Sequence, residues 1–529
     1  MKKGIYSTHP LFSSSETNNN NQDNDIDSKY QKRQENFMDE ENFSKIKETT
    51  MTTELSSSQN NRNLIFQRKR LKKSMNSETT QTLKNNLKIP IDLFEKCNTM
   101  NVDLSKFQEI ISSFRSQDIS QKYMGLVGIR KLLNMQSSSP IQELIDLGII
   151  TELISLLDNS PSEFQYEALW CLASIANGTT NQTYSIVAKG GVPKIIKIMD
   201  SSIEELKDQA IWILGNLAGD SAKIRDYLIK EKVFEKLITI LDSTNQPKII
   251  KQCTWALSNF FKVRPLIPYE TAKKCIKMIA KAILILPEDK EFLTDACFIL
   301  YFLTENYKET IKKLLDIDII KTIIKMLNVD AIYILINCLR IVGNIACGNA
   351  NQTQLLIDWG LLNCLKKTIK NPQKQIRKET AWIISNIAAG TQKQVEILIS
   401  EDFLPILIQI IKEDEEEVKK ECIWAVCNLT SVNNPNYLKK ILDQGILEII
   451  CFCLQIQDSK YLAVTIEALA NLLSFAQKDN PDKPNPIVEK IIKMKMADYL
   501  EKLQYHPVEF IYQKTLKILE TYFETEDVE

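Results

Sequence analysis

Histidine is nearly missing from this chain of 529 residues, which has only two, His9 and His506, near opposite ends. Histidine is the commonest general base and metal ligand, so its absence from the body argues against most hydrolytic and metal-dependent chemistry. No nucleophile, base and orienting group stand together in a recognisable motif, and no Gly-rich phosphate loop stands out. We therefore expect a protein that is not an enzyme and has no cofactor.

The chain also lacks net charge and long apolar runs. Its 66 Lys and Arg oppose 67 Asp and Glu, so it has no general attraction for polyanions, and nucleic acid is not an expected partner. No apolar run reaches the roughly 18 residues of a membrane-spanning helix, and no apolar signal-peptide core is present. These features predict a soluble, intracellular protein without membrane insertion.

The twelve cysteines are scattered, and many lie in apolar helical stretches, as Cys171, Cys253 and Cys297 do. In an intracellular protein this placement indicates buried, reduced thiols. Cys451 and Cys453 are close in sequence, but no second pair follows at zinc spacing. We therefore expect no metal site.

The chain falls into a polar arm and an apolar, helical body. Residues 1–90 are rich in Asn, Ser, Thr and Gln without apolar periodicity, which predicts a disordered arm. Residues 91–118 lead into the body, 119–525, where apolar residues recur at helical spacing between short loops. Strand signals are few, and 526–529 form an acidic tail. An all-α fold is expected.

A repeat of 42 to 43 residues organises the body. It is marked by a set of residues that we call the rungs: Trp170, Trp212, Trp255, Phe298, Arg340, Trp382 and Trp424. Four residues after each rung comes a member of the Asn row: Ser174, Asn216, Asn259, Phe302, Asn344, Asn386 and Asn428. The rungs and the Asn row together are called the ladder. This period lies in the range of armadillo and HEAT repeats and predicts an α-solenoid with an extended concave groove.

Other features are interpreted structurally. Residues 119–157 and 500–524 lack the ladder residues, as capping repeats should. The acidic run 413–417 falls between helices and is interpreted as a solvated turn.

The ladder has a chemistry of its own. Residues four apart share a helix face, so rungs and Asn row form one line along the array. Tryptophan alone would suit a core, but a repeated buried asparagine needs hydrogen-bond partners. In a groove, its carboxamide can donate to and accept from an extended peptide backbone, while indole faces attract cations. With the nearby acids Asp220, Asp295, Glu379 and Glu421, the pattern predicts a binder of basic peptides.

Three stretches carry a family resemblance, residues 209–220, 340–344 and 379–390. They read Gln-Ala-Ile-Trp-Ile-Leu-Gly-Asn-Leu-Ala-Gly-Asp, Arg-Ile-Val-Gly-Asn and Glu-Thr-Ala-Trp-Ile-Ile-Ser-Asn-Ile-Ala-Ala-Gly. They resemble importin-α (karyopherin-α), and this resemblance implies a right-handed armadillo-repeat α-solenoid of about ten repeats. The resemblance implies a nuclear-import adaptor that binds basic nuclear localisation signals of cargo proteins, links them to importin-β, and shuttles between cytoplasm and nucleus. It also implies that an export receptor contacts the C-terminal repeats.

The resemblance further implies two peptide sites. The major site would comprise Trp170, Ser174, Gly178, Thr183, Gln209, Trp212, Asn216, Asp220, Trp255, Asn259 and Asp295. The minor site would comprise Arg340, Asn344, Thr353, Glu379, Trp382, Asn386, Glu421, Trp424 and Asn428. Asp220 would bind the most critical lysine. Arg340, at a Trp position, would hold an acid in place rather than bind cargo directly.

The arm would bind importin-β and compete with cargo for the major site. Its basic cluster of Arg68, Lys69, Arg70, Lys72 and Lys73 suits that autoinhibitory role. Three serines, Ser56, Ser57 and Ser58, stand where the family has an Arg run, so weaker binding of importin-β is expected.

A scaffold for adhesion, cytoskeletal or signalling proteins is the alternative function for an armadillo array. Such scaffolds usually present Lys and Arg to acidic partners. The ladder offers Asn, Trp and acids instead, which favours basic partners and hence the import adaptor.

Overall fold

The computed structural model describes residues 90–135, 139–479 and 484–523. The chain divides into two units, Met1–Ser74 and Met75–Glu529, and every described residue belongs to the second. The predicted arm and the acidic tail lie outside the described residues. Within them, all regular structure is helical, which confirms the predicted all-α class.

Most helices follow one another in sets of three between Ile141 and Tyr522. The first helices of the sets are α7 (Ile141–Asp146), α10 (Thr180–Ala188), α13 (Ala222–Lys230), α16 (Tyr269–Ala272) with the 3-10 turn η2 (Lys273–Cys275), α19 (Glu309–Asp316), α22 (Ala350–Asp358), α25 (Gln392–Ser400), α28 (Pro435–Asp443) and α31 (Pro486–Lys493). The second helices are α8 (Ile149–Ser155), α11 (Gly191–Ile198), α14 (Val233–Ser243), α17 (Ile276–Ile285), α20 (Ile320–Met326), α23 (Leu361–Thr368), α26 (Phe403–Glu413), α29 (Ile446–Cys453) and α32 (Ala497–Leu503). The third helices are α9 (Ser162–Ile175), α12 (Glu204–Ala218), α15 (Pro247–Phe260), α18 (Lys290–Asn306), α21 (Ile332–Ala346), α24 (Lys374–Ala388), α27 (Glu416–Leu429), α30 (Ser459–Asp479) and α33 (Glu509–Tyr522).

Four elements precede these sets. They are α4 (Ile91–Thr99), the 3-10 turn η1 (Leu104–Lys106), α5 (Phe107–Phe114) and α6 (Ile119–Leu133). Helix α5 packs along α6, and α6 packs on α9 as a third helix would. Helix α4 packs on α6 through buried Phe94 and Cys97. The stretch 91–118, expected as a lead-in, is therefore folded onto the array.

Local sequence signals explain where the helices of a set begin. Helices α10, α22 and α25 each start with a capping box. In it, the side chain of a Thr or Asn accepts from the backbone amide of the Gln three residues later, and the side chain of that Gln accepts from the backbone amide of the Thr or Asn. The turn between first and second helices needs a left-handed residue. Glycine supplies it at Gly148, Gly190, Gly360 and Gly445, and the same register holds Lys232, Asp318, Asp402 and Lys495 with positive φ.

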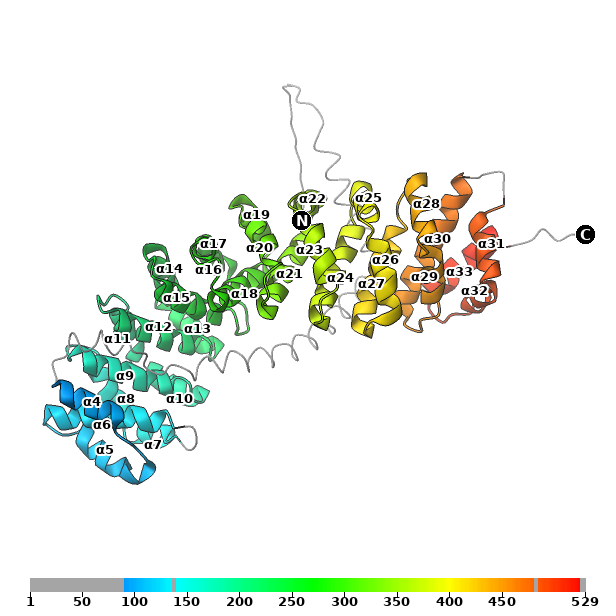
Figure 1. Ribbon diagram of the computed structural model, residues 1–529. Coiled ribbons are helices and arrows are strands. Elements are labelled where there is room, and N and C mark those ends of the chain that lie inside the picture. The colour runs from blue at the N-terminus through cyan, green and yellow to red at the C-terminus, as the bar shows by residue number, and fades with distance from the viewer. Residues whose placement is uncertain (1–89, 136–138, 480–483, 524–529) are drawn as a thin grey trace, which may run out of the picture. The chain divides into compact units, whose positions relative to one another are not determined.

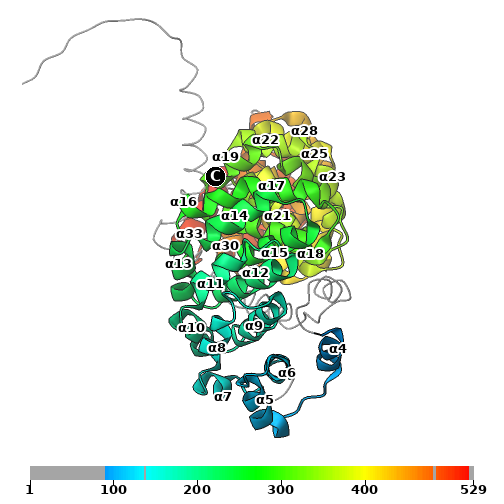
Figure 2. The ribbon, with the colours of Figure 1, turned by 90° about the vertical axis from the view of Figure 1, so that its left-hand side faces the viewer.

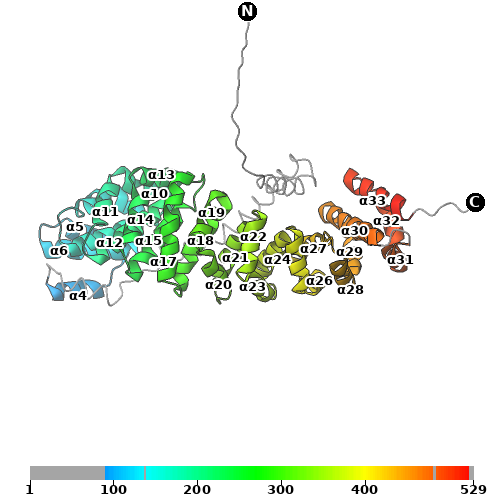
Figure 3. The same ribbon diagram turned by 90° about the horizontal axis from the view of Figure 1, so that it is seen from above.

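The third helices form the continuous layer of the array. Each packs on the next, from α6 and α9 through to α30 and α33. Figures 1 and 3 show α5 to α33 following one another in chain order, and Figure 2 views the helices from the side where α4 to α6 lie. One hydrophobic core runs through the described residues, because each set buries its apolar face on its neighbours.

The prediction for the cysteines is confirmed. Each of the twelve is reduced, and Cys347 alone is exposed while the other eleven are buried. The described residues contain no group of three or more His, Cys, Asp or Glu that could hold a metal ion. In the same part of the chain, every helix is too short or too polar to cross a membrane.

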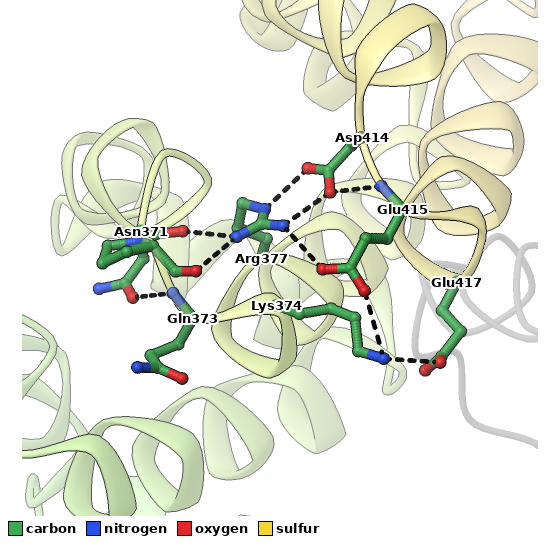
Figure 4. A network of polar contacts seen from close by, with 8 residues as sticks. Asn371, Gln373, Lys374, Arg377, Asp414, Glu415 and Glu417 are labelled. Atoms are coloured by element: carbon green, nitrogen blue, oxygen red, sulfur yellow. Dashed lines mark hydrogen bonds and ion pairs between the residues drawn. The ribbon is translucent and has the colours of Figure 1, made fainter.

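The acidic run 413–417 corrects the sequence interpretation. It does connect α26 to α27, but Asp414 is not simply solvated, because it accepts two hydrogen bonds from Arg377 of α24, each 2.7 Å long. Figure 4 shows this guanidinium between Asp414 and the carbonyl of Asn371, to which it donates at 2.9 Å. Lys374 adds ion pairs to Glu415 and Glu417 (Figure 4). The run thus ties two consecutive third helices together.

Candidate functional site

The ladder lies on the third helices of the sets. The seven rungs stand one to a helix on α9, α12, α15, α18, α21, α24 and α27, whereas Trp359 is off the ladder at the end of α22. Trp170, Trp212 and Trp255 are buried, and Trp382 and Trp424 are half-buried. The rungs therefore pack into the third-helix layer and contribute to the core as well as to a surface.

Two glycines allow an indole ring to pack directly against a neighbouring helix backbone. A side chain at Gly215 would lie 2.5 Å from the Trp255 ring, and one at Gly343 would lie 2.1 Å from the Trp382 ring. Each indole therefore rests directly on the backbone of the preceding third helix. This close approach fixes the ring planes along the ladder without any ligand.

The Asn row bridges neighbouring third helices. Nδ2 of Asn259 donates to the carbonyl oxygen of Gly215 at 2.9 Å, and Nδ2 of Asn428 donates to the carbonyl oxygen of Ser385 at 3.0 Å. Asn344 donates to the hydroxyl of Thr304 at 3.0 Å, and Asn386 to the thiol of Cys347 at 3.1 Å. The row therefore has a structural role that the sequence did not reveal, since part of its hydrogen-bonding capacity is used between repeats.

Asn216 differs from the rest of the row. It is 0% exposed, yet both its Nδ2 and its Oδ1 lack a hydrogen-bond partner among the residues described. Asn259 is the opposite case, because its Oδ1 also accepts from Nζ of Lys262. A buried amide left without partners costs about 1–3 kcal/mol per polar group, so Asn216 is held ready for a partner that supplies both a donor and an acceptor.

Asp220 lies one turn beyond Asn216, just after the end of α12. Its side chain is half-buried, and its Oδ2 is buried without a hydrogen-bond partner in the described part of the chain. The C-terminal end of a helix carries partial negative charge, which a carboxylate reinforces. The two together make this point attractive to a cation.

The acids of the second half are arranged differently. Arg340 donates from Nε to Oε1 of Glu379 at 2.7 Å and so holds this acid in place. The Arg340 guanidinium also lies 5.1 Å from the centre of the Tyr301 ring. Of the remaining predicted acids, Asp295 is buried and Glu421 is half-buried.

Several predicted site residues support the ladder from its edge. The hydroxyls of buried Thr183 and Thr353 donate at 3.2 Å to the carbonyls of Ala176 and Ala346, which end third helices. Gly178 lies in the turn before Thr183, and Gln209 is buried on α12 with its Oε1 unpaired within the described residues. The threonines thus fix the loops beside the ladder, since their hydroxyls are already occupied.

The ladder begins one repeat earlier than the sequence analysis proposed. Arg130 of α6 stands at the rung position. Four residues later, Oδ1 of Asn134 accepts a hydrogen bond from the hydroxyl of Ser174 at 3.4 Å. Arg130 bonds Glu167, as Arg340 bonds Glu379, and its guanidinium lies 4.7 Å from the Trp170 ring centre. The prediction that residues 119–157 lack the ladder residues is therefore wrong. The four-residue spacing from Arg130 to Asn134 could have indicated this earlier member of the ladder.

The Arg130–Glu167 pair is enclosed. Glu167 is 1% exposed, and helix α4 covers this end through Cys97. Burial, assisted by the Glu167 carboxylate and opposed by Lys131, raises the pKa of the Cys97 thiol to about 11. The Glu167 carboxylate and the Cys97 thiol are thus buried close together, so the Arg130–Glu167 pair is structural.

Comparisons with known proteins agree on one family. Models of the armadillo/β-catenin-like repeat match residues 137–177 and 391–431, and a model of an atypical armadillo repeat matches 485–529. Importin subunit alpha-3 of Arabidopsis thaliana is 34% identical over 427 residues, covering 79% of this chain and 80% of the relative. Importin subunit alpha-B of Dictyostelium discoideum is 35% identical over 470 residues, covering 88% and 89%.

A solved structure supports the fold independently. The crystal structure of an engineered protein superposes with a TM-score of 0.66, at 23% identity, over 80% of this chain and 98% of the other.

Proposed function

The chain belongs to the importin-α family, and from this premise we propose that it is a nuclear-import adaptor whose ladder binds Lys- and Arg-rich signals of cargo proteins. The observation that carries the proposal is the pair formed by Asn216 and Asp220. A buried carboxamide with both atoms unpaired suits a peptide backbone, and a carboxylate one turn away suits an ammonium group.

The two halves of the ladder support two sites. The first half carries Trp170, Trp212 and Trp255, with Asn216 and Asp220 at its centre. The second carries Trp382 and Trp424, with Glu379 held by Arg340. Aliphatic stems of lysines can lie between such indoles while their heads meet acids, so each half would take one basic cluster. We assign the predicted major and minor sites to these halves.

The partners follow from the same premise. The arm, 1–90, would link the adaptor to importin-β and, through Arg68–Lys73, would compete with cargo. The C-terminal repeats, up to α33, would contact an export receptor. The adaptor would then shuttle between cytoplasm and nucleus, and it would act by binding rather than by catalysis.

A charge reversal tests the proposal. A labelled peptide with a single basic cluster should bind the full chain saturably in a fluorescence-anisotropy titration. Asp220→Lys should weaken this binding at least tenfold, because it places an ammonium group where the peptide's lysine would lie. Asp443→Lys, at an exposed position of α28, is the matched control and should leave binding unchanged. Equal affinity for the two variants would contradict the assignment.

A further inference from the structure

The Asn row continues beyond its last predicted member. Asn471 on α30 follows Asn428 by 43 residues and is half-buried. Its Nδ2 donates to the Thr430 hydroxyl, at the end of α27, at 3.3 Å. Asn344 makes the corresponding bond to the Thr304 hydroxyl at 3.0 Å. The shared spacing and the shared kind of partner identify Asn471 as a further member of the Asn row.

The rung that precedes Asn471 is an acid. Glu467 stands four residues before it, and its Oε2 lies 2.6 Å from Nζ of Lys514 on α33. On the neighbouring helix, the Trp424 indole packs edge-on against Tyr461 of α30, with ring centres 6.3 Å apart. The ladder therefore continues past its last indole with a carboxylate and a carboxamide, the groups that recognise a cationic residue and its backbone.

Solvent exposure distinguishes the Glu467–Lys514 ion pair from the Arg130–Glu167 ion pair at the other end of the ladder. The Glu167 side chain is 1% exposed, so its partner Arg130 cannot be replaced from solution. The Glu467 and Lys514 side chains are 28% and 36% exposed, although Oε2 of Glu467, the atom that faces Lys514, is itself buried. A partly exposed ion pair contributes little net free energy, so another ammonium group that reaches Glu467 can take the place of Lys514 at small cost.

We propose that Glu467 and Asn471 form an additional cation subsite, which takes a Lys or Arg of a peptide bound to the second half of the ladder and which Lys514 occupies until then. The proposal rests on the proposed function, since it needs a basic peptide on the ladder. Lys514 acts in it as an internal competitor. A cargo signal whose second basic cluster is longer by one residue gains affinity through this exchange.

The experiment compares peptides with and without the added cation. A labelled two-cluster basic peptide and versions carrying one further Lys, or Ala, at either end of the second cluster are titrated against the full chain. In Lys514→Ala, the added Lys should improve affinity about two- to fivefold more than in the unmodified chain, because its competitor is gone. In Glu467→Gln the added Lys should give no gain. Lys517→Ala, at an exposed position of the same helix, is the control.

Each outcome decides the matter. An equal gain from the added Lys in all variants, or a gain in none of them, overturns the subsite. If the parent peptide fails to bind the unmodified chain, the proposed function itself fails. Glu467→Gln gives an independent answer if Lys514→Ala unfolds, which melting followed by circular dichroism reveals.

Discussion

Single residues of the ladder differ in what they do, although they share one sequence pattern. Asn428 and Asn259 bond a neighbouring helix, whereas Asn216 has both amide atoms unpaired within the described part of the chain. A spacing rule cannot separate these cases, because it fixes the helix face and not the partner that tertiary packing supplies. The sequence therefore predicted where the asparagines lie but not which of them are available to a ligand.

This difference gives opposite predictions for two alanine variants. Asn428→Ala removes a bond to Ser385 and should cost about 1 kcal/mol of stability. Asn216→Ala removes two unpaired buried groups, so the melting temperature should stay the same or rise, while affinity for a basic peptide falls about tenfold. Thermal melting and anisotropy on the same samples measure both quantities. An equal loss of stability in the two variants would show that Asn216 is an ordinary structural residue.

At the scale of helices, the period predicted that the ladder follows one helix face along the array, because each rung and the following asparagine stand four residues apart. Contacts between helices were harder to foresee. Asp414 was interpreted as part of a solvated turn, since its partner Arg377 stands on the preceding third helix. The first repeat was read as lacking a ladder, because its rung is Arg130 rather than an indole. A change of residue type hid these positions, although the spacing persisted.

The contact between α24 and α27 predicts a pH-dependent stability. Burial tends to raise the pKa of Asp414, but the hydrogen bonds from Arg377 and from the Glu415 amide outweigh it and hold that pKa below its ordinary value. A lowered pKa stabilises the folded state above the unfolded value of about 3.9, and the contribution is lost as pH falls through the folded value. Asp414→Asn should therefore destabilise the protein by about 1–3 kcal/mol at pH 7, and by progressively less below pH 4.

Urea unfolding over this pH range measures the effect. The exposed Glu416→Gln is the control, since it removes one negative charge from the same segment. A destabilisation by Asp414→Asn that is the same at pH 7 and at pH 3 would show that the carboxylate's charge does not matter.

At the scale of the whole array, charges link successive repeats. Lys194 pairs with Asp158, Lys236 with Asp200 and Lys440 with Asp402, at 2.6 to 2.8 Å, each across a repeat boundary. These pairs are exposed and individually weak, so apolar burial between the sets remains the main source of stability. Under the proposed function, the acids of the ladder are the local feature that would select basic partners.

The central claim is that basic peptides bind on the ladder, and the chain's own tryptophans test it most directly. Five of its six tryptophans are rungs, and Trp359→Phe removes the sixth, so that all indole emission reports on the ladder. Titration of this variant with an unlabelled two-cluster basic peptide should change the emission saturably, with the same Kd as anisotropy gives, and an acidic peptide of equal length should not. Peptide binding by anisotropy without any change in indole emission would place the site elsewhere and contradict the account.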